Sequence, residues 1–100
     1  MAAAAFDEAL RLAPDNAVVE LSYCLFWLGY SRPERALPLC RRAVELEPDF
    51  GAAWLHLGRA WQELGKAYQA REAYEKAAAL SPGDPVAPLL LRSLPPPGRR

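Results

Sequence analysis

The sequence predicts an all-α fold, a solenoid of short helical hairpins. Alanine, leucine, glutamate and arginine, which favour helices, dominate blocks that prolines and turn residues separate. No block shows the period-2 alternation of a half-buried strand. Pro14, Pro48 and Pro82 are spaced 34 residues apart. A 34-residue period that holds two helices is typical of a helical solenoid.

Six helices are expected, over residues 1–13, 16–30, 32–47, 51–64, 66–80 and 85–94. Ser31 and Glu34 fit a capping box that opens the third helix, with Ser31 as N-cap. Gly65 ends the fourth helix, and Asp84 and Pro85 fit the N-cap and first position of the last one. Short helices separated by such brief turns are expected to pack antiparallel.

Two segments depart from regular helix patterns. Pro38 lies inside the third block, where it removes a helix hydrogen bond, so we expect a kink or an irregular turn over residues 34–38. The last block is weakened by Pro88, but its leucines can cover the exposed flank of helix 66–80. Residues 95–100 are expected to form a disordered tail.

Internal repetition extends beyond the prolines. The segments EALRLAPD (8–15), RAVELEPD (42–49) and KAAALSPG (76–83) align without gaps. In the same register the alanines repeat, and an aromatic residue or a thiol lies between each pair of them. The repeating positions are Ala2, Ala36 and Ala70, then Phe6, Cys40 and Tyr74, then Ala9, Ala43 and Ala77.

These residues resemble the tetratricopeptide repeat family, whose pattern is W-x2-L-G-x2-Y…A-x3-F…P. The repeat at 51–84 supplies Trp54, Leu57, Gly58, Trp61, Ala70, Tyr74 and Pro82. The preceding repeat has Glu20 where tryptophan is expected, followed by Tyr23, Cys24, Trp27, Ala36, Cys40, Ala43 and Pro48. The resemblance implies a right-handed superhelix in one domain over residues 1–94. It would consist of a half repeat (1–14), two repeats (17–50 and 51–84) and a capping segment (85–94).

Gly58 marks the expected contact between the two helices of a repeat. We expect it to lie against Ala70 and Ala77, so that the backbones approach closely and offset the helix cost of glycine, which is about 0.5–1 kcal/mol. Aromatic side chains then fill the space on either side. The expected repeat core comprises Ala36, Ala43, Pro48, Trp54, Leu57, Gly58, Trp61, Ala70, Tyr74, Ala77 and Pro82.

The two cysteines do not form a disulfide framework by number or spacing. Cys24 takes the place of the glycine in the first full repeat, so we expect Cys24 and Cys40 to lie in one core layer. Their proximity makes a disulfide conceivable, but buried reduced thiols that pack as soft apolar residues are the expected state.

Composition narrows the classes of function. The chain has 12 basic and 12 acidic residues, so no basic field favours nucleic acid or an anionic membrane. Asp7 and Glu8 interrupt the N-terminal apolar run, which argues against a signal peptide, and no apolar run reaches the roughly 20 residues of a membrane span. We therefore expect a soluble, cytoplasmic protein. With one histidine and no glycine-rich phosphate loop, we expect no catalytic, cofactor or metal site, and no enzyme.

Helix 16–30 has more apolar faces than its own repeat requires. One stripe, with Tyr23 and Trp27, should face the second helix of the repeat, and another, with Phe26, should meet helix 1–13. Because first helices line the concave groove in tetratricopeptide repeats, the resemblance assigns the remaining stripe to that groove. The expected groove residues are Val18, Leu21, Leu25 and Leu28, followed by Leu55, His56, Arg59 and Gln62, with Ala52 and Glu63 at the edges.

The expected function is that of a non-enzymatic adaptor that binds a partner polypeptide in the groove, with Arg59 available to an acidic group. An equally weighted alternative is structural: a fragment or self-associating segment that stacks through its apolar half repeat and could form a homo-oligomer. Arg59 as a plain solvated charge is the simplest interpretation of that residue. A regulatory part of a larger enzyme is a third possibility. The family subclass that binds acidic chaperone peptides uses lysines, asparagines and an arginine in the groove. The groove positions here supply no lysine or asparagine, so that activity is not expected.

Overall fold

The computed structural model describes residues 2–96, and these form six α-helices and no strand. The expected all-α helical-hairpin solenoid is confirmed. The helices are α1 (Ala2–Leu12), α2 (Ala17–Gly29), α3 (Pro33–Leu46), α4 (Gly51–Glu63), α5 (Ala67–Leu80) and α6 (Val86–Arg92). Each end lies within two residues of the expected one. The expected disordered tail over residues 95–100 falls mostly outside the described residues.

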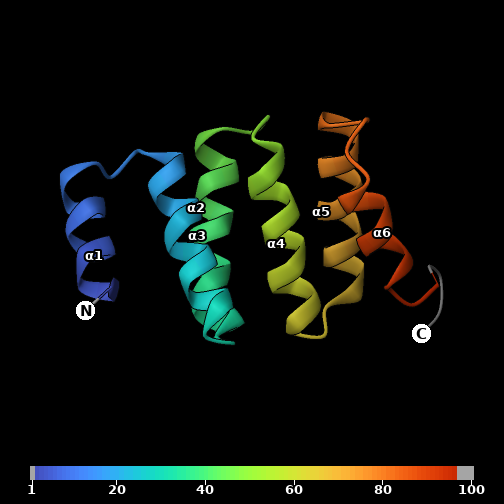
Figure 1. Cartoon of the computed structure of the whole chain (residues 1–100), viewed down its shortest axis with the longest axis horizontal. Coiled ribbons are helices and arrows are strands. Elements are labelled where there is room, and N and C mark those ends of the chain that lie inside the picture. The colour runs from blue at the N-terminus through green and yellow to red at the C-terminus, as the bar shows by residue number, and fades with distance from the viewer. Residues whose placement is uncertain (1, 97–100) are drawn as a thin grey trace.

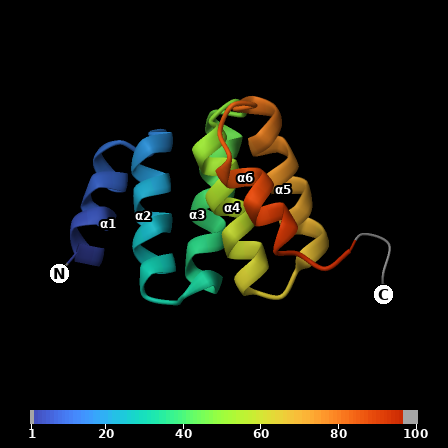
Figure 2. The same cartoon turned by 45° about the vertical axis from the view of Figure 1, so that its right-hand side comes forward.

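The helices follow one another along an elongated body of 42 × 25 × 19 Å (Figure 1). The most extensive contacts are within the hairpins α2–α3 and α4–α5, and α3 then packs against α4 to join them. The helix α1 flanks α2 at one end. At the other end α6 lies across α4 and α5 (Figure 2), where Leu90 and Leu91 pack against the cluster around Tyr74 as expected, whereas Leu89, which was also expected to cover α5, is exposed.

The helix ends show where short-range sequence signals succeeded and failed. Asn16 caps α2, because its Oδ1 accepts hydrogen bonds from the backbone N–H groups of Val18 and Val19 at 3.0 and 3.2 Å. The capping box at Ser31 is wrong: α3 begins after Arg32 without a side-chain cap. Ser31 instead turns the chain with a φ of 59°, and Gly65, one repeat later, does so with a φ of 79°. The hairpin turn needs a left-handed residue at this position, and this need overrides the capping pattern.

Proline has less effect on the third helix than its position suggests. The helix α3 continues through Pro38 from Pro33 to Leu46, so the expected irregular turn is wrong, and a kink stays a prediction. Pro38 stands near the start of the helix with its side chain exposed. Only one interior hydrogen bond is therefore lost, and packing of the buried face of α3 retains the helix. At α6, Asp84 Oδ1 accepts from the Val86 N–H as expected, while Pro85 is the N-cap rather than the first helical residue.

The core has two parts. The larger joins α2, α3 and α4 around small residues, among them Ala36, Ala43, Ala53 and Ala60, which lets these helices approach closely. The second surrounds Tyr74 and Leu94 under α6. The expected core residues Ala36, Ala43, Leu57, Gly58, Ala70, Tyr74 and Ala77 are buried, and Trp54 and Trp61 are half-buried.

Two residues that the sequence predicted to lie in the core are exposed instead. Pro48 and Pro82 lie exposed in the loops after α3 and α5, because a proline that follows a helix acts by preventing the helix from continuing. The carbonyl of Pro48 still supports the repeat, because it accepts a 2.7 Å hydrogen bond from Trp54 Nε1.

The contact at Gly58 also differs in detail from the expectation. A Cβ on Gly58 would lie 2.5 Å from Cε1 and 2.6 Å from Cδ1 of Tyr74, so the tyrosine ring, rather than Ala70 or Ala77, occupies the space that glycine leaves. The ring is fully buried, and the hydroxyl donates a 2.6 Å hydrogen bond to Gln62 Oε1. Burial raises the pKa of Tyr74 to about 12, so this hydroxyl stays protonated at neutral pH.

Cys24 and Cys40 do lie together in the core, but the expectation of reduced thiols is wrong. The two form a disulfide between α2 and α3, with 5.6 Å between their Cα atoms. Both are fully buried. The repeat register brings the two positions face to face, which the spacing of 16 residues along the chain does not reveal.

Candidate partner-binding surface

The exposed apolar residues of α2 lie on one face of that helix. Val18 is 59% exposed and Leu25 is 39% exposed, and they are separated by about two helical turns. The Asn16 cap fixes the start of this helix directly before Val18. These two side chains are the part of the expected leucine stripe that solvent reaches.

The same face continues onto α4, one repeat later. Ala52 and Arg59 follow Val18 and Leu25 by 34 residues, and both are exposed. The Arg59 guanidinium lies 4.0 Å from Glu63 Oε2, a distance too long for a strong hydrogen bond in a pair that is partly solvated. We call Val18, Leu25, Ala52, His56 and Arg59 the α2–α4 surface.

His56 contributes a neutral ring to the α2–α4 surface. Its side chain is partly buried, and its Nδ1 is buried without a hydrogen-bond partner among the described residues. Burial first, and the positive charge of Arg59 second, hold the pKa of His56 below its usual range. At neutral pH the imidazole is therefore uncharged, and Arg59 carries the positive charge of this surface.

Two leucines expected in the groove are not available to a partner. Leu21 and Leu28 are each only 7% exposed, and they belong to the core that joins α2 to α4. Assigning them to the groove is wrong, because these positions of a first helix face the first helix of the next repeat. A helix considered alone cannot reveal this neighbour.

The equivalent positions on α4, Leu55 and Gln62, are only partly buried, and residues of α6 and its C-terminal end lie among their neighbours. Leu55 packs against the cluster around Tyr74 and Leu94. Gln62 accepts from the Tyr74 hydroxyl and donates a 3.0 Å hydrogen bond to Ser93 Oγ. Gln62 thus joins α4, α5 and the end of α6, and it is engaged within the molecule rather than free for a partner. Nothing in the sequence pattern pointed to Ser93.

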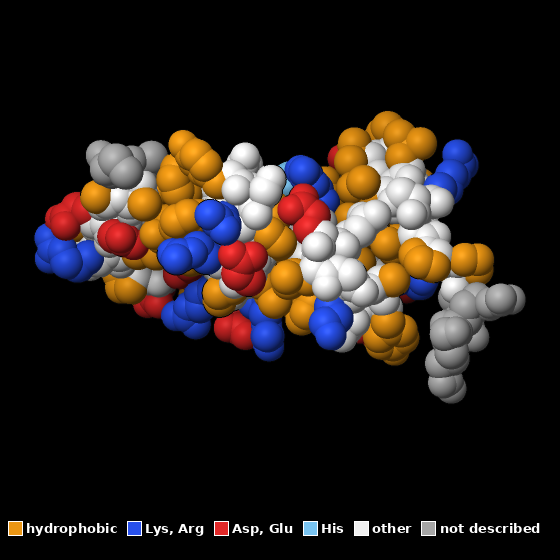
Figure 3. Space-filling model, turned by 90° about the horizontal axis from the view of Figure 1, so that it is seen from below, with side chains coloured by type: hydrophobic (Ala, Val, Ile, Leu, Met, Phe, Trp, Pro, Cys, Tyr) orange, Lys and Arg blue, Asp and Glu red, His pale blue; other side chains and the backbone are white. Residues whose placement is uncertain are grey.

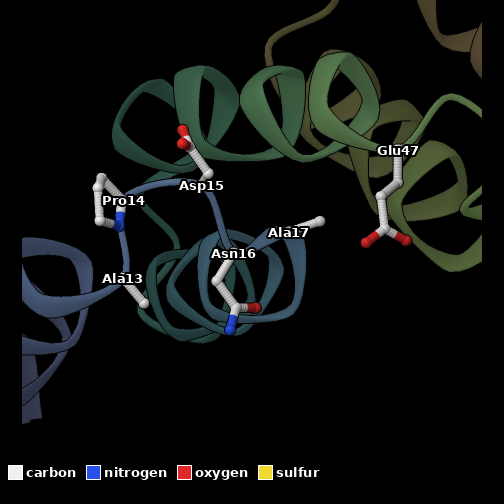
Figure 4. A pocket seen from close by; sticks show the side chains of 6 residues that line it. All are labelled: Ala13, Pro14, Asp15, Asn16, Ala17 and Glu47. Atoms are coloured by element: carbon white, nitrogen blue, oxygen red, sulfur yellow. The ribbon is translucent and has the colours of Figure 1, made fainter.

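A different hollow, of about 480 Å³, lies beside the α1–α2 loop and is lined by Ala13, Pro14, Asp15, Asn16, Ala17 and Glu47 (Figure 4). Its polar groups do not converge. Asn16 is used as the α2 cap, Asp15 pairs with Arg42 at 3.2 Å, and Glu47 lies apart from both. We therefore do not assign a site to it.

The surface charge agrees with the balanced composition. Basic and acidic side chains are interleaved on the face seen in Figure 3, with hydrophobic side chains between them. Within residues 2–96 no three His, Cys, Asp or Glu side chains are grouped as metal ligands. None of the helices in this part of the chain is long and apolar enough to cross a membrane.

Comparison with known proteins agrees with this architecture. The chain is 37% identical over 83 residues to the Hsp70-Hsp90 organizing protein of Triticum aestivum; the match covers 83% of this chain and 14% of that protein. The chain thus spans about a seventh of the length of this relative.

Solved structures show the same fold. The first TPR of Spaghetti (RPAP3) bound to the HSP90 peptide SRMEEVD has a TM-score of 0.89 at 24% identity, over 92% of this chain and 73% of that one. The second TPR domain of human RPAP3 in complex with the HSP70 peptide SGPTIEEVD has a TM-score of 0.88 at 24% identity, over 92% and 77% of the two chains. The family model described as tetratricopeptide repeat matches residues 28–85. The chain belongs to the tetratricopeptide repeat family.

Proposed function

We propose that this chain is an adaptor module that binds a segment of another polypeptide along the α2–α4 surface. The observation that carries the proposal is that Val18 and Leu25 are exposed on α2, and that Ala52 and Arg59, at the equivalent positions of the next repeat, are exposed on α4, which contacts α2. Apolar contacts at one end and a charge at the other suit an extended or helical peptide with an acidic group.

The relatives support a peptide ligand in general terms. Two structural neighbours hold chaperone peptides, SRMEEVD and SGPTIEEVD. The α2–α4 surface has an arginine but no lysine or asparagine. We therefore propose a ligand that relies more on apolar contacts with Val18 and Leu25 than on a ring of basic groups.

A peptide library tests this proposal even though the natural partner is unidentified. The chain is immobilised, peptides are selected from a random phage-displayed library, and their affinities are measured by fluorescence anisotropy. We expect Leu25→Asp to weaken the selected peptides at least about tenfold, as loss of a central apolar contact does. Arg59→Glu should weaken those peptides that carry acidic residues and should remove most of their salt dependence.

Leu12→Asp is the matched control, because Leu12 is 69% exposed and belongs to α1, which contributes no residue to the α2–α4 surface. It should leave the affinities unchanged. Peptides that bind Leu25→Asp and Arg59→Glu as well as they bind the natural chain would contradict the proposed site.

The second candidate function is self-association. Exposed leucines lie at both ends of the solenoid, with Leu12 on α1 and Leu89 on α6. If copies stack end to end through these helices, sedimentation velocity should show association that rises with concentration and that Leu12→Asp or Leu89→Asp abolishes. A monomer over the whole concentration range would contradict it.

We also propose that the module acts without catalysis, in the cytoplasm, and without binding nucleic acid or membranes. The single histidine and the bonded cysteines leave few groups for acid–base or nucleophilic chemistry. Equal numbers of acidic and basic residues provide no field that would attract polyanions. Fractionation of cells that express the tagged chain tests the location, and a nitrocellulose filter assay with duplex DNA tests the absence of nucleic-acid binding.

A further inference from the structure

The disulfide lies at a contact between two helices of the first repeat, and the second repeat makes the equivalent contact without a covalent bond. Cys24 and Cys40 precede Gly58 and Tyr74 by 34 residues each, so the two pairs are equivalent contacts between the first and second helices of successive repeats. In the second repeat the contact is a glycine against a buried ring. In the first repeat both positions are cysteines, and a covalent bond joins them.

The two helix–helix contacts respond differently to a reductant. The contact between Gly58 and Tyr74 is held by packing and by the hydrogen bond from Tyr74 to Gln62, and a reductant changes neither of them. The contact between Cys24 and Cys40 joins Cα atoms 5.6 Å apart, and both side chains are fully buried. Two unbonded thiols need a wider separation between their sulfur atoms than a bonded pair. In a close-packed interface they must rotate into neighbouring atoms or push α2 and α3 apart.

We propose that the Cys24–Cys40 pair is a redox-sensitive lock on the α2–α3 hairpin. The oxidised pair holds the hairpin closed, and the reduced pair loosens it while the α4–α5 hairpin keeps its packing. The hairpin includes α2, which carries Val18 and Leu25, so an effect on partner binding rests on the proposed function. The lock itself does not.

The chemistry is thiol–disulfide exchange with a small disulfide such as oxidised glutathione. The thiolate of one cysteine attacks the glutathione disulfide, forms a mixed disulfide and releases one glutathione thiolate. The second cysteine thiolate then attacks the mixed disulfide, forms the Cys24–Cys40 bond and releases the second glutathione. Each thiol that ionises gives up a proton, and each released thiolate takes one up. Reduction is the reverse, and burial of both sulfurs requires the hairpin to open first.

The first measurement uses the unaltered chain. After equilibration in buffers with different ratios of reduced to oxidised glutathione, the protein is unfolded in an alkylating agent, and its mass counts the free thiols. We expect no free thiols in oxidising buffer, two in reducing buffer, and a midpoint between them. Thermal unfolding should show a fall on the order of 10–20 °C when the bond is reduced, as removal of a cross-link over a short loop predicts.

Two variants separate the bond from the packing. The double variant Cys24→Ser with Cys40→Ser removes the bond and keeps similar side-chain volumes. Its unfolding temperature should therefore be close to that of the reduced natural chain, whether or not reductant is present. Cys24→Gly with Cys40→Tyr installs the pair of the second repeat. This variant should unfold at a higher temperature than the reduced natural chain, and reductant should not change that temperature.

The lock is wrong if free thiols persist in oxidising buffer, or if the bond survives every glutathione ratio. It is also wrong if reduction leaves the unfolding temperature unchanged. These measurements need no binding partner. They can therefore refute the redox lock while the proposed peptide binding is confirmed, and they can support the lock while peptide binding is refuted.

Discussion

The contact between Gly58 and Tyr74 allows a sharp test of how these hairpins pack. The perturbation is Gly58→Ala, which adds one methyl group. That methyl would lie 2.5 Å from the Tyr74 ring, closer than carbon atoms approach without displacement. The ring cannot easily move aside, because it is fully buried and its hydroxyl is bonded to Gln62.

The expected magnitude is the difference between two opposing effects. Replacing glycine by alanine inside a helix stabilises it by roughly 0.5–1 kcal/mol. Overpacking a well-filled core typically costs about 1–3 kcal/mol, and the rigid, anchored ring places this contact near the upper end. We therefore expect Gly58→Ala to lower the free energy of unfolding by about 2 kcal/mol, which for a domain of this size is a fall in Tm on the order of 10 °C.

Urea unfolding followed by circular dichroism measures the effect, with the disulfide kept oxidised throughout. Gly29→Ala is the matched control, because a Cβ at Gly29, at the end of α2, meets nothing within 4 Å. That change should be neutral or slightly stabilising. The comparison holds the residue change constant and varies only the space around it.

A double-mutant cycle identifies the cause. In a Tyr74→Ala background the ring is gone, so Gly58→Ala should become neutral or stabilising by up to about 1 kcal/mol. A neutral effect of Gly58→Ala in the natural chain would refute the packing argument. So would an equal loss with and without the ring.

Two further substitutions probe buried polar groups. Glu20 is buried at the repeat position of Trp54; burial is the main cause that raises its pKa, opposed by Arg42. Relative to the unfolded chain, the fold therefore favours the neutral carboxyl of Glu20. The resulting stabilisation is fully present below the unfolded pKa of about 4.5 and is lost as the pH rises through the raised folded pKa. Glu20→Gln should consequently raise stability at pH 7 and flatten the pH dependence above about pH 4.5, measured by urea unfolding; no gain at pH 7 would contradict this. Gln62→Ala leaves the Tyr74 hydroxyl without its acceptor and should cost about 1–3 kcal/mol, with faster hydrogen exchange in α6, whereas unchanged exchange there would argue against the bridge to Ser93.

Periodic signals in the sequence were sufficient for the architecture. Helix formers between prolines predicted all six helices, and the 34-residue period predicted how they pair. These signals are reliable because each repeats along the chain, so local errors average out. Single-residue signals were weaker: Ser31 fits a cap by pattern, but the hairpin turn needs a left-handed residue there.

The candidate surface was only partly predictable. Val18, Leu25 and Arg59 are exposed and therefore accessible to a partner, whereas Leu21 and Leu28 are buried in the core that joins α2 to α4. A helical wheel gives the direction of a side chain relative to its own axis. It does not give the position of the next first helix, which decides whether that side chain is covered.

The sequence by itself determined that this chain is an α-helical solenoid of the tetratricopeptide type, because helix propensity and repeat spacing are local and periodic. Only the tertiary structure decided which apolar residues remain exposed, that Tyr74 fills the space at Gly58, and that Cys24 and Cys40 are bonded. The physical reason is common to all three. Each depends on contacts between helices whose separation and rotation are set by the packing of the whole core, and no single segment encodes them.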